Sequence, residues 1–184
     1  MKKILIVVDV QKDFYHPDGA LYVKGAEKLP EKIANILPNF DDAIFTMDWH
    51  PNTHCSFKNN GGIWPTHCVA FTEGASLPKE FIPYLRHIKN ENYNVVTKGM
   101  NPEKEEYGAN ALSIMLAHNR TPIDCEFVFC GIAGNYCVME TIKNFITMFP
   151  TVKTSVLVDC VASIDDGTTL RKFMEENNIP EFKI

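Results

Sequence analysis

Five short, continuous apolar runs limit the fold of this chain more than any other feature. Each is rich in β-branched or aromatic residues and lacks a regular alternation with polar residues. Such a run predicts a strand that is covered on both faces, as in a parallel sheet. The runs lie at Ile4–Val10, Ala43–Asp48, Asn94–Lys98, Phe127–Ile132 and Ser155–Ala162.

Helix-like segments separate most of these runs and cover Ala26–Leu37, Ala109–Asn119, Asn135–Phe149 and Thr168–Asn178. The alternation predicts an α/β fold with a doubly wound, mostly parallel sheet flanked by helices. A further short strand near Phe182 is expected to close one edge. The length of 184 residues predicts a single domain over residues 1–184.

Composition excludes several classes of partner and location. The net charge is −5, and no basic cluster is dense enough to suggest nucleic acid or an anionic membrane surface. No apolar segment approaches the ~20 residues that span a bilayer. The apolar stretch in MKKILIVVDVQKDF ends at Asp9, and this stretch is too short for a signal peptide. We therefore expect a cytoplasmic protein. The six cysteines are therefore expected to be reduced thiols.

Functional side chains are expected at one edge of the sheet. Three runs end at or near a charged residue, Asp9, Asp48 or Lys98, and a fourth leads into the Gly-rich turn before Cys137. In open α/β sheets, ligands bind outside the carboxyl ends of the strands. These residues should therefore converge, although they are far apart in the sequence.

Cys137 has two interpretations. A helix that begins near Asn135 would place it in the first turn, where backbone N–H groups and the helix dipole favour a thiolate and can hold an oxyanion. Alternatively, it is a small buried hydrophobic residue, which is the usual state of a free cysteine. Cys130, inside the apolar run, is interpreted as core.

Asp9 and Lys98 also have a non-catalytic interpretation each: Asp9 would be a turn residue, and Lys98 a solvent-exposed lysine. Beside Cys137, however, a carboxylate could take the thiol proton and pass it to a leaving amine, while the ammonium stabilises both anions. Burial would raise the pKa of the Asp9 carboxyl and Lys98 would lower it. The sequence does not decide between these two effects.

Asp48, His50 and His67 form a candidate metal site. One carboxylate and two imidazoles suit Zn²⁺, Fe²⁺ or Mn²⁺. The alternative is a loop whose histidines cap turns and pack on Trp49 and Trp64. His54 could be a fourth ligand or a partner of the ligands; His16, His87 and His118 lie in polar stretches and receive no role.

Two aromatic residues, Phe14 and Trp64, flank these groups in the sequence. Most aromatic side chains are core residues, but a flat aromatic substrate would need stacking partners on this edge.

At these motifs the sequence resembles the isochorismatase-like cysteine hydrolases and, within them, the nicotinamidases. The matching segments are VVDVQKDF with Asp9, DWHP and WPTHC with Asp48, His50 and His67, TKG with Lys98, and CGIAGNYCV with Cys137. The Asp-x-His…His set separates nicotinamidases from isochorismatases and carbamoyl-amide hydrolases. One departure is Asn135, where the family often has Asp.

The resemblance implies a metal-dependent amidohydrolase that converts nicotinamide to nicotinate and ammonia, and pyrazinamide is a further candidate substrate. Zn²⁺ would be the favoured metal ion and would meet the ring nitrogen. Phe14 and Trp64 would sandwich the ring, and Cys137 would form a thioester. The backbone N–H groups of Ala133 and Cys137 would hold the oxyanion, next to a cis peptide at Ile132–Ala133. Family members are often homo-oligomers.

Three alternatives stay open. One is another small-amide or isochorismate-type hydrolase on the same fold. The second is a thiol redox protein, which the lack of a CxxC motif disfavours. The third is a non-catalytic metal-binding protein, which the joint presence of Asp9, Lys98 and Cys137 disfavours.

Overall fold

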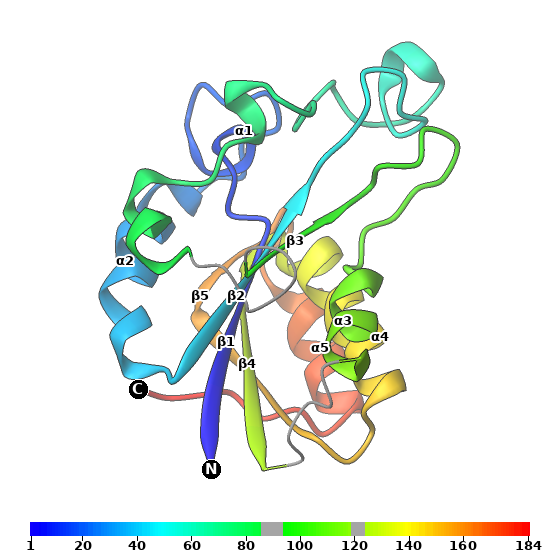
Figure 1. Cartoon of the computed structure of the whole chain (residues 1–184). Coiled ribbons are helices and arrows are strands. Elements are labelled where there is room, and N and C mark those ends of the chain that lie inside the picture. Colours follow the sequence, from blue (N-terminus) through cyan, green and yellow to red (C-terminus); the bar gives the residue numbers. More distant parts are fainter. Residues whose placement is uncertain (86–93, 119–123) are drawn as a thin grey trace.

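A five-stranded sheet, in which all strands are parallel, forms the centre of the protein (Figure 1). The computed structural model describes residues 1–85, 94–118 and 124–184. The strands run in the order β3-β2-β1-β4-β5. Their bounds are β1 Lys2–Val8, β2 Asp42–Asp48, β3 Val95–Lys98, β4 Cys125–Ile132 and β5 Lys153–Ala162. The predicted parallel sheet is confirmed.

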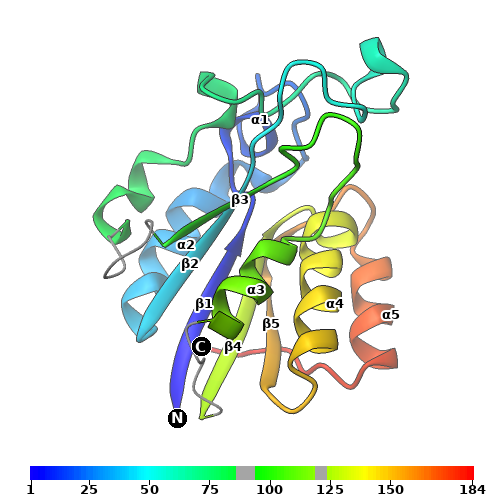
Figure 2. The ribbon, with the colours of Figure 1, turned by 45° about the vertical axis from the view of Figure 1, so that its right-hand side comes forward.

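Helices cover both faces of the sheet (Figure 2). On one face lie α3 (Asn110–His118), α4 (Met139–Met148) and α5 (Thr168–Glu176), and on the other lies α2 (Leu29–Ile36). The short helix α1 (Lys12–Tyr15) follows β1 at the carboxyl end of the sheet. In its described part, the connection from β2 to β3 carries short 3₁₀ turns and includes the His-containing loop.

The continuous apolar runs are explained by this double cover. In β1, Leu5 and Val7 belong to the core cluster on the α2 side, whereas Ile4, Ile6 and Val8 belong to the cluster on the other side. Successive side chains of a strand point to opposite faces. Both faces are buried here, so both sets must be apolar.

Some predicted elements differ in detail from the structure. The strand expected near Phe182 is only a single bridge between Val156 and Glu181. The helix predicted from Asn135 begins as a π-helical turn, Gly134–Val138, before α4. The predicted helix end at Asn119, the residue His87 and the side chain of His118 lie outside what the structure describes.

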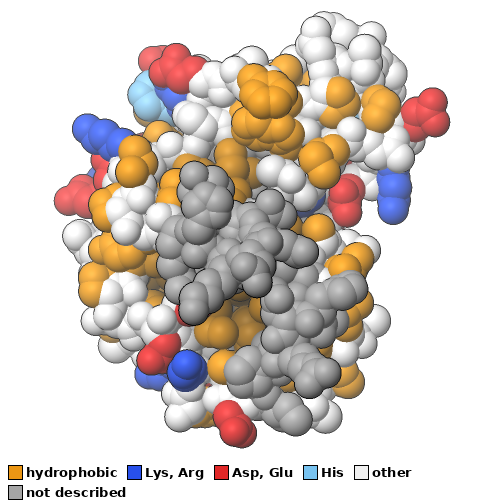
Figure 3. Space-filling view, in the orientation of Figure 1, with side chains coloured by type: hydrophobic (Ala, Val, Ile, Leu, Met, Phe, Trp, Pro, Cys, Tyr) orange, Lys and Arg blue, Asp and Glu red, His pale blue; other side chains and the backbone are white. Residues whose placement is uncertain are grey.

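No helix among the described residues is long and apolar enough to cross a bilayer. Hydrophobic side chains reach the surface in several separate groups on the visible part of the face in Figure 3. The most exposed large hydrophobic residues are Phe71, Met1 and Ile184, at 91%, 72% and 68%. The homo-oligomer that the resemblance implies stays a prediction.

Candidate active site

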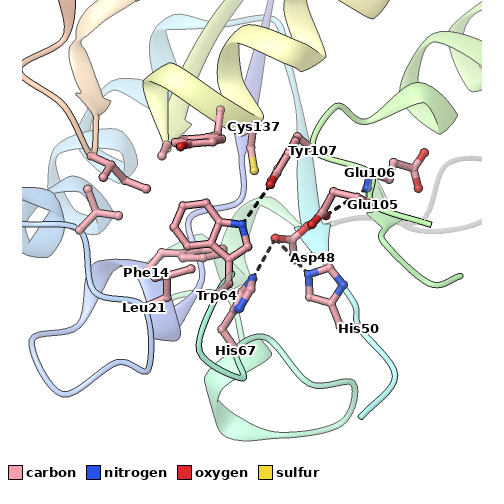
Figure 4. Close-up of a pocket in the computed structure, with 14 residues that line it drawn as sticks. Phe14, Leu21, Asp48, His50, Trp64, His67, Glu105, Glu106, Tyr107 and Cys137 are labelled. Carbon is pink, nitrogen blue, oxygen red and sulfur yellow. Dashed lines mark hydrogen bonds and ion pairs between the residues drawn. The ribbon is translucent and has the colours of Figure 1, made fainter. Parts of the chain in front are cut away.

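A pocket lies at the carboxyl end of the sheet, where the sequence predicts chemistry (Figure 4). It is lined by Phe14, Leu21, Val23, Asp48, His50, Trp64, His67, Glu105, Glu106, Tyr107, Ala133, Tyr136, Cys137 and Ile164. These residues lie at the end of β2 or in the segments that follow β1, β2, β3, β4 and β5. Asp9 and Lys98 do not line the pocket, but Lys98 contacts both Cys137 and Asp9.

Lys98 is the centre of a buried charged group. Its Nζ lies 2.9 Å from Asp9 Oδ2 and 3.5 Å from Cys137 Sγ, and it forms a short ion pair with Asp48 Oδ1. Asp48 and Lys98 are partners in the register of β2 and β3, which explains their contact. Asp9 follows β1 with a φ of +48° and accepts a hydrogen bond from Thr46 Oγ1 at 2.6 Å. All three charged side chains are almost fully buried.

Burial and the ion pairs shift the pKa values of this group in opposite directions. Burial raises the pKa of the Asp9 carboxyl despite the nearby Lys98 ammonium, so burial is the larger of the two effects between which the sequence did not decide. Burial opposes the charge on Asp48, but Lys98 and the two imidazoles hold the pKa of Asp48 below its usual range. The ion pairs with Asp48 and Asp9 likewise outweigh burial at Lys98, whose pKa lies well above its ordinary value.

The thiol of Cys137 does not follow the expectation of a resting thiolate. Burial raises its pKa well above the ordinary value, Lys98 lowers it, and Asp9 raises it through its charge and a hydrogen bond. The expected effect of the helix terminus is weaker than desolvation here, because Cys137 lies in a buried π-helical turn. The site therefore holds a protonated thiol beside a carboxyl that can accept its proton.

The turn before Cys137 brings the backbone close to the substrate pocket. The peptide Ile132–Ala133 is cis, as the resemblance implies. Gly131 has a φ of +120°, and a Cβ there would overlap the backbone of Val8, so β4 needs glycine at this position. Ala133 and Cys137 both line the pocket. Cys130, by contrast, is fully buried in the core on the α2 side, as predicted.

Asp48, His50 and His67 form the second group of the site. Figure 4 shows the Asp48 carboxylate between the two imidazoles, with Oδ2 at 3.5 Å from His50 Nε2 and 3.9 Å from His67 Nε2. One ligand atom from each of the three residues lies within 4.8 Å of the others, and all three are buried. Such a group of one carboxylate and two imidazoles fits a divalent metal ion.

The outer nitrogens of the two imidazoles are anchored by backbone carbonyls. His50 Nδ1 lies 2.9 Å from Gly99 O, and His67 Nδ1 lies 2.7 Å from Pro65 O. A proton on each Nδ1 leaves the Nε2 lone pair free to bind a metal ion. This arrangement is a further reason why the residues fit a metal site.

His54 is not part of this ligand group. Its Nδ1 lies 2.7 Å from Ser56 Oγ and its Nε2 lies 3.2 Å from Lys104 O. Its ring packs on His50 with centroids 4.2 Å apart. Of the two roles left open by the sequence, the geometry favours a supporting partner of His50.

Phe14 and Trp64 both reach the pocket. Phe14 is buried with its ring centroid 5.5 Å from that of His67. The Trp64 indole donates a hydrogen bond to Tyr107 Oη at 3.0 Å and meets the Tyr136 ring edge-on. Aromatic surfaces therefore lie next to the candidate metal site, as a flat aromatic ligand requires.

Sequence reasoning missed several pocket and supporting residues. Gln11 is fully buried, donates to Asp48 O at 2.8 Å and accepts from Asp48 N at 2.7 Å, so its amide fixes the backbone of Asp48. A polar residue just past a buried strand was the available signal. Tyr107 lies in a polar segment without an apolar pattern, and no role in the pocket was predicted for it.

Asn135 contacts the loop that follows β5. Its Oδ1 accepts a hydrogen bond from Ile164 N at 3.0 Å, and Ile164 lines the pocket. A carboxylate at this position could accept the same bond. The departure from the family pattern therefore keeps an acceptor for Ile164 while removing a charge.

The parallel sheet, its two helical layers and the buried groups at its carboxyl edge define an isochorismatase-like hydrolase fold. The chain is 30% identical to the nicotinamidase of Saccharomyces cerevisiae, over 95% of this chain and 94% of the relative. No protein-family model matches it.

Two crystal structures agree with this relationship. A complex of L. infantum PnC1 with nicotinate superposes with a TM-score of 0.80 at 29% identity, covering 99% of this chain and 92% of the other. The pyrazinamidase of Pyrococcus horikoshii in complex with zinc has a TM-score of 0.76 at 28% identity, covering 100% of both chains. The chain belongs to the nicotinamidase family.

Proposed function

We propose that the protein hydrolyses nicotinamide to nicotinate and ammonia through a thioester on Cys137. The observation that carries this proposal is one buried group in which Lys98 Nζ contacts Asp9, Asp48 and Cys137. Asp48 also belongs to the candidate metal group, so the two parts of the site share a residue. The relatives named as nicotinamidases and the zinc-bound pyrazinamidase support the same reaction.

Asp48, His50 and His67 would hold the metal ion, and Zn²⁺ is favoured over Fe²⁺ or Mn²⁺. The donor set suits all three ions, and the pyrazinamidase that superposes on this chain was crystallised with zinc. When bound, the ion supplies a Lewis-acid contact for the ring nitrogen of the substrate. Phe14 and Trp64 would pack on the ring and direct its carboxamide toward Cys137.

In the first half of the reaction, Asp9 takes the proton of the Cys137 thiol. The sulfur then attacks the carboxamide carbon, and the backbone N–H groups of Ala133 and Cys137 hold the oxyanion. As the tetrahedral adduct collapses, Asp9 returns the proton to the amine, and ammonia leaves. Lys98 stabilises the carboxylate form of Asp9 and the thiolate of Cys137.

In the second half, Asp9 takes a proton from water while the water oxygen attacks the thioester carbon. Collapse of this adduct breaks the C–S bond and releases nicotinate, and Asp9 returns its proton to the sulfur. A carboxyl whose pKa is raised by burial suits both the acid and the base steps near neutral pH.

Product analysis of the purified protein with nicotinamide tests this function. Equal amounts of nicotinate and ammonia are expected from the unaltered protein, and neither from Cys137→Ala. If the protein releases no ammonia from nicotinamide but acts on another small amide, the alternative hydrolase of the same fold is correct. Reduction of a disulfide substrate would instead favour the thiol redox alternative.

A further inference from the structure

The side chain of Glu106 holds the residue that follows Lys98. Glu106 Oε2 accepts a hydrogen bond from Gly99 N at 3.1 Å, and its backbone carbonyl accepts one from Lys98 Nζ at 3.4 Å. Glu106 is half-buried and lines the pocket. Glu106 therefore connects the loop after β3 to Lys98 and Gly99, at the end of that strand.

Gly99 in turn fixes the imidazole of His50. Its carbonyl accepts the hydrogen bond from His50 Nδ1 at 2.9 Å, which directs Nε2 toward Asp48. Gly99 has a φ of +66°, and a Cβ at this position would overlap the His50 ring. The peptide of Gly99 thus lies directly against the ring, and a shift of this peptide has to move His50.

We propose that Glu106 is a positioning residue that holds His50, through Gly99, in the orientation needed to bind the metal ion. This inference rests on the proposed metal-dependent function. Figure 4 shows Glu106 on the same side of the pocket as Asp48 and His50. Loss of a group that orients a metal-binding histidine typically lowers the metal affinity about 10- to 100-fold.

Competition with a chelator for Zn²⁺ tests the inference on the full chain without substrate. Glu106→Ala is expected to weaken Zn²⁺ binding about 10- to 100-fold and to change the visible spectrum of the Co²⁺-substituted protein. Glu106→Gln should bind Zn²⁺ like the unaltered protein, because its side-chain oxygen still accepts the Gly99 N–H. Glu103→Ala, an exposed position in the same loop, is the matched control.

Unchanged Zn²⁺ affinity and an unchanged Co²⁺ spectrum in Glu106→Ala would overturn the inference. An equal loss in Glu106→Gln would do so too, because it would assign the effect to charge. If Glu106→Ala does not fold, Gly99→Ala carries the test: it should also weaken Zn²⁺ binding, and unweakened binding would contradict the inference.

The inference and the proposed function fail in different ways. An unaltered protein that binds Zn²⁺ but releases no ammonia would refute the proposed function only. An unaltered protein that binds no Zn²⁺ would refute the inference itself.

Discussion

Replacing Lys98 by Met should destabilise the metal-free protein in a way that depends on pH. Lys98 is 2% exposed and lies between the carboxyls of Asp9 and Asp48, which are 0% and 3% exposed. Breaking a buried ion pair from one side typically costs about 3–5 kcal/mol. Asp9 can limit this loss by taking up a proton, because its pKa is already raised by burial.

The size of the effect follows from the proton uptake. Holding one carboxyl protonated against its ordinary pKa costs about 1.4 kcal/mol per pH unit, hence about 4 kcal/mol at pH 7 and about 2 kcal/mol at pH 5.5. Because the pKa of Asp9 is raised further in Lys98→Met, its folded state binds the proton and gains stability as the pH falls. The destabilisation relative to the unaltered protein should therefore shrink toward acid pH.

Urea unfolding at both pH values, with a chelator present, measures this effect. The double variant Asp9→Asn, Lys98→Met should recover most of the loss at pH 7, because it removes the carboxyl that must be protonated. A loss below about 1 kcal/mol at pH 7, or one that is equal at both pH values, would refute the reasoning.

Three further predictions concern the thiols and the pocket. Cys137→Ala should bind Zn²⁺ normally and lose nicotinamide hydrolysis, whereas Cys130→Ala should keep hydrolysis and lower the urea midpoint; active Cys137→Ala would exclude it as the nucleophile. Asp9→Asn should speed alkylation of Cys137 by iodoacetamide at neutral pH, because the carboxyl raises the thiol pKa, yet abolish ammonia release; slower alkylation would contradict this. Phe14→Leu should raise KM for nicotinamide more than it lowers kcat, and steady-state kinetics with an unchanged KM would argue against ring packing.

The sheet could be predicted because burial on both faces leaves a direct mark in the sequence. Every residue from Ile4 to Val8 must be apolar when both faces of β1 are covered. The structure of the C-terminal segment near Phe182 could not be predicted in the same way. One bridge to Val156 needs no repeated apolar pattern, so a single bridge and a short strand look alike in the sequence.

The grouping of the candidate site could be predicted because parallel strands end at the same edge. Asp48 and Lys98 were expected near each other, and they are partners in the sheet register. The state of the Cys137 thiol could not be predicted, because it depends on how completely water is excluded. Gln11 and Glu106 were missed because their side chains hydrogen-bond to backbone groups of Asp48 and Gly99. Every residue has such backbone groups, so the partner's identity leaves no mark in the sequence.

The most direct test of the account is the rate of ammonia release from nicotinamide by the metal-stripped protein before and after one equivalent of Zn²⁺. The account predicts that turnover is lost on stripping, returns with Zn²⁺, and does not return in a His67→Ala variant. Full turnover by the stripped protein would contradict it, because the ring would then bind without the metal ion that Asp48, His50 and His67 are proposed to hold.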